Sequence, residues 1–210
     1  PDVLNCNDWQ TAATIIYLRG LYGKKFGFDH IKTVFTIHNI EYQGKYGLDT
    51  AADVFGFPEW ILGSVEFDGC VNLMKGAIEL ADKVTTVSPT YAKEIRSPFF
   101  AQGLDTIINR NAGKLCGILN GIDESLNNPE TDGALFKNYS VNDLIGKAVC
   151  KAELQKMLGL PVRDVPVIAM ISRLVSHKGL DLVKCVLDEL LCEDVQFIIL
   201  GKGDVDYENY

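Results

Sequence analysis

The chain has 210 residues and 47% of them are hydrophobic, which is enough for the packed core of one large domain or two small ones. Its 28 acidic and 20 basic residues give a formal net charge of −8, which disfavours nucleic acid or an anionic membrane as a partner. No apolar run approaches the ~18 residues of a membrane span, and the first residues lack the features of a signal peptide, so we expect a soluble, intracellular protein.

The cysteines are scattered singly and form no C-x-x-C pair, so we interpret them as buried thiols of a reducing compartment. The six positions are Cys6, Cys70, Cys116, Cys150, Cys185 and Cys192. They indicate no zinc site, and we predict no metal site elsewhere in the chain.

The chain opens with the end of a strand and the start of a helix. Val3 and Leu4 are typical of a strand, and Asp8 lies where the following helix begins. That helix has an apolar face formed by Ala13, Ile16, Tyr17 and Leu21. From the local sequence alone, Asp8 is best interpreted as an N-cap that accepts hydrogen bonds from helical N–H groups.

A second strand is predicted at residues 32–37, which are β-branched and aromatic. His38 and Asn39 follow its carboxyl end and begin a loop that continues through Tyr42 and Gln43. A lone histidine is more often structural than functional. This one follows a predicted parallel strand, where open α/β sheets bind their ligands, so a functional role stays open.

Residues 45–119 continue the alternation of strands and helices after an aromatic-rich insertion at 45–70. The insertion could stack sugar rings, but aromatic clusters are more often satellite core. Helices are predicted around 73–80, from Ser88-Pro89 onward, and at 103–110, with strands at 83–87 and 115–119.

The next segment, 121–139, is a long polar loop with four acidic residues. It lacks the regular spacing of an EF-hand, so we interpret these acids as solvated turn residues rather than a calcium site. A helix that includes Leu144 and Met157 precedes an apolar run, 165–171, which we interpret as a buried parallel strand.

A basic loop follows this strand and carries Arg173, His177 and Lys178. The next helix has Leu180, Val183, Leu187, Leu190 and Leu191 on its apolar face. Cations at a helix N-terminus are unfavourable unless an anion lies between them, and phosphate is the simplest such anion. The alternative is that these side chains are solvated on a surface loop, and the chemistry of the residues leaves both interpretations open.

The last segment is a predicted strand at 195–200 followed by Gly201-Lys202-Gly203-Asp204-Val205-Asp206. A G-x-G without a third glycine is a weak dinucleotide signal, and the D-x-D fits a hydrogen-bonding turn as well as a metal site. Serine hydrolase, zincin and P-loop motifs are absent.

Five stretches of the chain resemble motifs of the glycogen and starch synthases that use nucleotide-glucose. They are PDVLNCNDWQTA at the start, FTIHNIEYQGKYG at 35–47, LADKVTTVSPTYAKEI at 80–95, GILNGIDESLNNPETD at 117–132, and SRLVSHKGLDL at 172–182. They follow the family's order over nearly all 210 residues. The chain departs from the family at Asn5 and Asn7, which replace two histidines before the Asp8-Trp9 pair.

This resemblance implies an α/β fold with parallel sheets and flanking helices, made of parts of two Rossmann-like domains that face an interdomain cleft. The implied reaction is retaining transfer of glucose from ADP-glucose, or less favourably UDP-glucose, to the non-reducing end of an α-1,4-glucan. It needs no cofactor, and the implied location is the cytoplasm or the plastid stroma. The implied catalytic residues are Arg173, Lys178, His38 and Asp8, and the implied substrate-binding residues are Asn39, Tyr42, Gln43 and Asn120.

We expect residues 1–112 to belong to an N-terminal, acceptor-side domain and residues 113–210 to a C-terminal, nucleotide-sugar-binding domain. The family's K-x-G-G-L loop and its glutamate motif are missing, so we expect this chain to be an incomplete and inactive part of the enzyme. Two alternatives stay open: a related nucleotide-sugar transferase with another acceptor, and a non-catalytic module that binds glucan or nucleotide.

Overall fold

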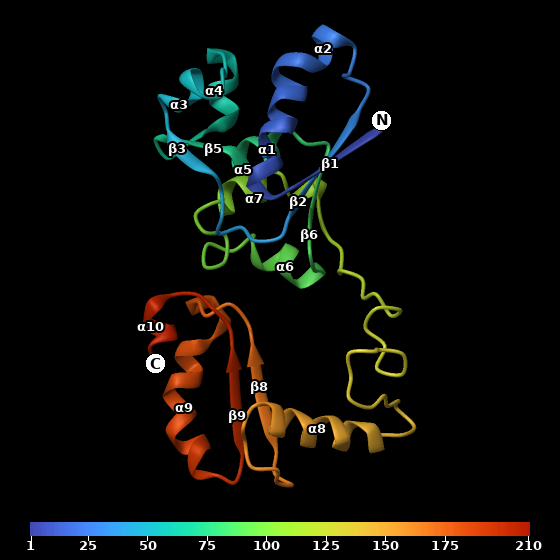
Figure 1. Cartoon of the computed structure of the whole chain (residues 1–210). Helices are drawn as coiled ribbons and strands as arrows, with labels where there is room; N and C mark the ends of the chain where they lie inside the picture. The colour runs from blue at the N-terminus through green and yellow to red at the C-terminus, as the bar shows by residue number, and fades with distance from the viewer. The chain divides into compact units, whose positions relative to one another are not determined.

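The computed structural model describes residues 1–210 and contains two compact units, Pro1–Gly121 and Ile122–Tyr210 (Figure 1). Each unit has its own parallel sheet with flanking helices, which confirms the predicted α/β class. The predicted division after residue 112 is wrong, because β7 (Leu115–Gly117) pairs with β6 (Lys83–Thr86) and so belongs to the first sheet.

The main sheet of the first unit has the order β1-β2-β6-β7, and every neighbouring pair is parallel. Its first two strands are β1 (Val3–Asn7) and β2 (Lys32–Ile37), with Asn7 opposite Thr36 in the register. The carboxyl ends of all four strands therefore meet at one edge of the sheet, where ligands bind in open α/β folds.

Helices of the first unit alternate with these strands. They are α1 (Asp8–Tyr17), a π-helical turn at Leu18–Tyr22, α2 (Gly23–Phe26), α5 (Leu73–Leu80), α6 (Pro89–Glu94), α7 (Asp105–Arg110) and a short 3₁₀ turn at Ala112–Lys114. The start of α6 is as predicted, because Pro89 is its first residue and the Ser88 hydroxyl accepts a hydrogen bond from the Tyr91 N–H.

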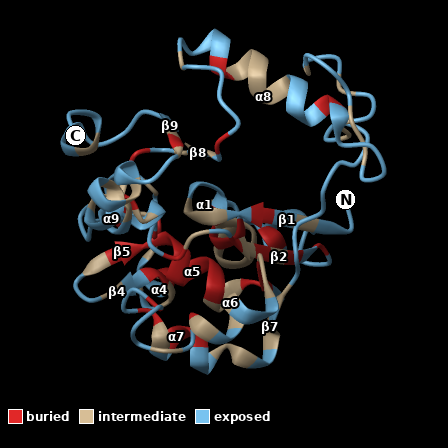
Figure 2. Cartoon of the chain, turned by 90° about the horizontal axis from the view of Figure 1, so that it is seen from below, coloured by how far each residue is buried: buried red, intermediate tan, exposed pale blue.

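The core of the first unit lies between β2 and the helices α1 and α5, where Figure 2 shows buried residues concentrated. Ile15 and Ile16 of α1, Phe35 of β2 and Ile78 of α5 are fully buried. Gly76 allows the close packing of α1 on α5, because a Cβ there would come within 2.9 Å of the Ile16 side chain.

The aromatic-rich insertion forms a small antiparallel sheet of order β3-β5-β4, with β3 (Lys45–Gly47), β4 (Glu66–Phe67) and β5 (Cys70–Asn72). Two helices, α3 (Thr50–Asp53) and α4 (Glu59–Val65), lie between β3 and β4 in the chain. Phe55 and Phe57 stack with their ring centroids 5.2 Å apart and pack on the main core, whereas Trp60 is exposed. The satellite-core interpretation is therefore confirmed for Phe55 and Phe57.

The second unit contains a parallel pair of strands, β8 (Val167–Ile171) and β9 (Gln196–Leu200), joined by α9 (Leu180–Cys192). Before β8 lies α8 (Ile145–Met157), and after β9 lies the short α10 (Val205–Glu208). A buried hydrogen bond of 2.7 Å from Gln155 Nε2 to Gln196 Oε1 joins α8 to the start of β9.

Two predictions about burial are wrong for this chain. The strand β8 forms, but Ile168 and Ile171 on it are exposed. Leu191, on the apolar face of α9, is exposed as well. Among the six cysteines only Cys6 is buried, since two are half-buried and three are exposed. The sheet of the second unit has only two strands, so it is too small to bury the whole apolar face of α9, and the helices leave part of the sheet uncovered.

The polar loop before α8 consists of turns held by acidic side chains, as predicted. Asp123 Oδ1 accepts hydrogen bonds from the N–H groups of Ser125 and Leu126, and Asp132 Oδ1 accepts one from the Ala134 N–H. No helix of the structure combines the length and the apolar character needed to cross a membrane.

Candidate active site

The sheet edge of the first unit brings four polar side chains around one cavity of about 260 Å³. Asn5 and Asn7 come from β1, His38 follows β2, and Asn120 follows β7. Thr36, Thr85 and Thr86 complete the polar part of the wall. The structure thus places the predicted residues His38 and Asn120 at one site, although they are far apart in the sequence.

Asp8 lies beside this cavity and binds the loop that follows β2. Its Oδ1 atom accepts hydrogen bonds from the N–H groups of His38, at 2.8 Å, and Asn39, at 3.4 Å. The predicted N-cap role is wrong, because Asn7 occupies the N-cap position and neither side chain caps α1. Asp8 has a φ of 55°, in the left-handed region that few residues other than glycine adopt.

Four consecutive N–H groups, those of residues 38–41, donate to side-chain oxygens. Beyond the two bonds to Asp8, the Ile40 N–H donates to the Tyr91 hydroxyl at 3.1 Å, and the Glu41 N–H donates to Asn39 Oδ1 at 2.9 Å. Burial raises the pKa of Tyr91; the hydrogen bond from the Ile40 N–H opposes this rise, and the negative charges of Asp8, Glu94 and Glu41 add to it. Its hydroxyl therefore stays protonated near neutral pH, and the loop is held in place before any ligand arrives.

Gln43 lies in the same loop, but its side chain is buried and serves the loop itself. Its Nε2 group donates to the carbonyl oxygens of Ile40, at 3.1 Å, and Gln102, at 2.9 Å, while its Oε1 accepts from Asn72 Nδ2 at 2.7 Å. Gln43 also lines the second cavity described below, and the substrate-binding role expected for it stays a prediction. Asn72 is a positioning residue that the sequence did not reveal, and it also caps α5 through the Lys75 N–H.

Tyr42 lines a second cavity of the first unit, of about 350 Å³, together with Trp9 and Tyr46. The rings of Trp9 and Tyr46 lie 6.2 Å apart, and the charged side chains of Glu41 and Lys45 flank them. Aromatic faces with nearby hydrogen-bonding groups are suited to binding sugar rings. Gly44 completes this wall with a φ of 66°, and a Cβ there would lie 2.6 Å from the Trp9 ring.

The basic loop of the second unit runs from the end of β8 to the start of α9. It includes a 3₁₀ turn at Ser176–Lys178 and then Gly179, whose φ of 75° starts the helix. The side chains of Arg173, His177 and Lys178 are exposed and make no hydrogen bond or ion pair in the structure. The positive charges of Arg173 and Lys178 are therefore available to an anion, and the geometry is equally compatible with solvation of these side chains.

The G-x-G loop after β9 packs directly against this basic loop. A Cβ on Gly201 would lie 2.0 Å from the Ser172 carbonyl oxygen, and one on Gly203 would lie 2.2 Å from that of Leu174. The Leu174 N–H donates to the Lys202 carbonyl at 3.1 Å. The two glycines therefore allow close approach of the two loops, a role that their sequence pattern did not reveal.

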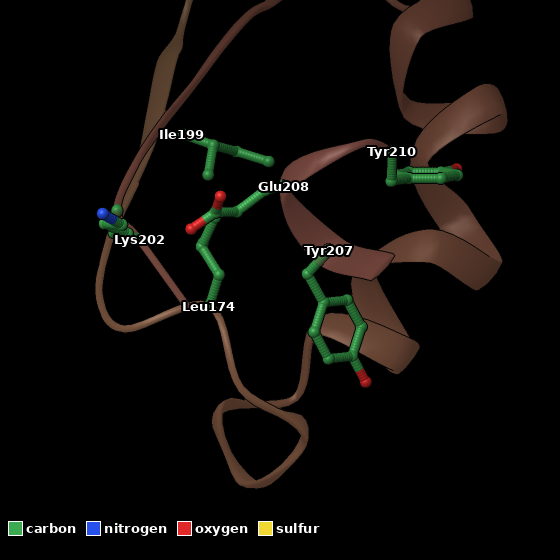
Figure 3. Close-up of a pocket in the computed structure, with 7 residues that line it drawn as sticks. Leu174, Ile199, Lys202, Tyr207, Glu208 and Tyr210 are labelled. Atoms are coloured by element: carbon green, nitrogen blue, oxygen red, sulfur yellow. The ribbon is translucent and has the colours of Figure 1, made fainter. Parts of the chain in front are cut away.

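A cavity of about 530 Å³ lies beside these loops in the second unit. Its lining residues are Leu174, Ile199, Gly201, Lys202, Tyr207, Glu208 and Tyr210. Figure 3 shows Glu208 reaching from α10 toward Leu174, and its Oε1 accepts a hydrogen bond from the Gly203 N–H at 2.8 Å. No three side chains of His, Cys, Asp or Glu come together in an arrangement that could hold a metal ion.

Comparison with known proteins gives matches over the whole chain. A family model described as the starch synthase catalytic domain matches residues 1–110. The chain is 45% identical over 212 aligned positions to a glycogen synthase of Clostridium acetobutylicum and 49% identical to one of Ligilactobacillus salivarius. Each alignment covers 100% of this chain and 44% of the relative, so the chain spans less than half the length of these relatives.

A solved structure also matches. It is the catalytic domain of starch synthase IV from Arabidopsis thaliana bound to ADP and acarbose, with 37% sequence identity and a TM-score of 0.89. The match covers 98% of this chain and 43% of that chain.

Proposed function

Because this chain belongs to the starch synthase catalytic domain family, we propose that it forms part of a glycogen or starch synthase. The proposed reaction transfers glucose from ADP-glucose to the 4-hydroxyl at the non-reducing end of an α-1,4-glucan, with retention of anomeric configuration. The bond between glucose C1 and the diphosphate oxygen breaks with its electron pair left on ADP, a bond from C1 to the acceptor oxygen forms, and the proton of the acceptor hydroxyl passes to the released ADP.

The observation that carries this proposal is the 45% identity to a glycogen synthase along the entire chain. The aligned region includes the polar edge of the first unit and the basic loop of the second. The solved relative bound to ADP and acarbose supports a nucleotide-sugar donor and a glucan-like acceptor.

The proposed roles follow from the placement of the side chains. Arg173 and Lys178, which are exposed and unpaired, would neutralise the diphosphate while charge develops on its oxygens. His38 and Asn39, held by Asp8, would contact the donor glucose. The aromatic wall around Tyr42 would bind the acceptor.

The test is a donor comparison with the complete protein. Glycogen is incubated with ADP-glucose or UDP-glucose labelled in the sugar, and labelled polymer and free nucleotide are measured together. We expect equal amounts of ADP and transferred glucose, with ADP-glucose preferred. Nucleotide binding without any transfer would instead support a non-catalytic binding module, and transfer to another acceptor alone would support a related transferase.

A further inference from the structure

Two consecutive residues at the junction of β1 and α1, Asn7 and Asp8, both bind His38. Asp8 Oδ1 accepts the His38 N–H at 2.8 Å, and Asn7 Oδ1 lies 2.9 Å from His38 Nε2. His38 is thus held at its ring by the last residue of β1 and at its main chain by the first residue of α1. Neither Asn7 nor Asp8 uses its side chain to cap α1.

The backbone of Asp8 is adapted to this contact. Its φ of 55° lies in the left-handed region, which costs free energy for most residues but is tolerated best by asparagine, aspartate and glycine. This conformation aims the carboxylate across from β1 to the loop after β2. Both hydrogen bonds go to the same oxygen, Oδ1, so the contact needs one acceptor atom at that place rather than a full negative charge.

The Asn7 contact decides which ring nitrogen of His38 carries the proton. The side-chain carbonyl of an asparagine can only accept, so His38 Nε2 must donate and Nδ1 is left with a lone pair in the neutral ring. No other hydrogen bond involves this ring, and His38 lines the 260 Å³ cavity with Asn120. The ring therefore offers an acceptor to a hydroxyl-bearing ligand.

We propose that Asn7 and Asp8 are positioning residues, which fix His38 in the Nε2-protonated form with Nδ1 free to accept a hydrogen bond from a sugar hydroxyl. Asp8 acts through the main chain of His38 and Asn39 and does not itself contact the sugar. The ligand and the kinetic part of the test rest on the proposed function, whereas the spectroscopic part does not.

The spectroscopic test uses the 210-residue chain without any ligand. The chain has three histidines, and long-range ¹⁵N spectra of neutral imidazole rings report the protonated nitrogen directly. His30 is an internal reference with the opposite expectation, because its Nδ1 lies 2.9 Å from the Gly27 carbonyl oxygen and must donate to it. The signals of His38 are assigned as those that disappear in His38→Gln. We expect them to show a proton on Nε2. In Asn7→Leu, which removes the acceptor, the ¹⁵N chemical shifts of the two ring nitrogens of His38 should move toward each other. Protonation at Nδ1 of His38 would overturn the proposal.

The kinetic test uses the complete protein and compares Asp8→Asn with Asp8→Gly. Both variants accommodate the left-handed backbone, but only asparagine keeps an acceptor oxygen for the two N–H groups. Misplacement of a reacting group by about 1 Å lowers the rate on the order of a hundredfold. We therefore expect kcat to fall on the order of a hundredfold in Asp8→Gly and only about threefold in Asp8→Asn. Equal losses in the two variants would mean that the charge of Asp8 acts on the substrate and would contradict the proposal, as would a near-normal kcat in Asp8→Gly.

Asp68 supplies the matched control, since its φ is 52°, it is exposed, and its side chain has no hydrogen-bond partner. Asp68→Gly should keep the wild-type kcat, and circular dichroism checks that every variant is folded. If the wild-type protein transferred no glucose, the proposed function would fail, while the protonation state of His38 would still be decided by the spectra.

Discussion

Replacing Arg173 by alanine in the complete protein should abolish most of the activity and leave the fold intact. The guanidinium group is exposed and has no hydrogen bond or ion pair to lose, so the free energy of unfolding should change by less than about 0.5 kcal/mol. A charge-assisted contact to the diphosphate in a water-poor site contributes roughly 3 kcal/mol in the transition state, so kcat should fall on the order of a hundredfold. KM should change much less, because the contact strengthens as charge develops on the leaving oxygen.

The assay is steady-state release of ADP, with thermal unfolding measured on the same samples. Arg173→Lys should recover part of the rate, because an ammonium group lacks the planar pair of donors of a guanidinium. Lys156→Ala is the matched control, since this exposed lysine pairs only with Glu153 on α8. A near-normal kcat in folded Arg173→Ala and Lys178→Ala would show that both side chains are merely solvated, and it would refute the phosphate assignment.

Three further predictions concern stability, metal dependence and loop packing. Asp82→Asn should destabilise the chain by about 1–2 kcal/mol near pH 7, because Asp82 accepts bonds from the Thr33 N–H and hydroxyl and from Arg19. Burial alone would raise the pKa of Asp82, but these hydrogen bonds outweigh it and lower the pKa. Their contribution to stability is therefore complete above the ordinary carboxyl pKa and is lost as the pH falls through the lowered pKa of Asp82. The denaturation curves of the wild type and Asp82→Asn should converge in acid, and a difference in stability that stays constant with pH would contradict this prediction. EDTA should leave activity unchanged, since the basic loop supplies the countercharge of the diphosphate, and loss with rescue by magnesium would contradict that role. Gly201→Ala should displace the loop at Ser172 and lower kcat at least tenfold, because its Cβ would lie 2.0 Å from a carbonyl oxygen, whereas Gly113→Ala, with open space around it, should not.

Much of the fold could be predicted because its signals are local. The β-branched run 32–37 gave the bounds of β2 residue for residue, and Ser88-Pro89 gave the start of α6. The order of strands and helices in a parallel α/β fold likewise placed His38 at the carboxyl end of β2, whereas Asn120 was assigned to the other domain and only the structure brings it to the same sheet edge.

The local sequence does not reveal contacts between residues far apart in the chain. Gln43 bonds to Asn72 and Gln102, which lie 29 and 59 residues away, and no local pattern marks such partners. The left-handed backbone of Asp8 likewise depends on the loop after β2, so the local sequence favoured a helix cap instead. The unit boundary was misplaced because the strand at 115–119 was predicted but its pairing with β6, which puts it in the first sheet, is not marked in the sequence.

Analysis of the product tests the central claim most directly. The complete protein is incubated with maltoheptaose and ADP-glucose labelled in the sugar, and the purified product is digested with β-amylase, which removes maltose from the non-reducing ends of α-1,4-glucans. A retaining transfer to the 4-hydroxyl predicts that the label is released in maltose in the same amount as ADP appears. Label that resists the enzyme, or ADP released without labelled glucan, would contradict the account.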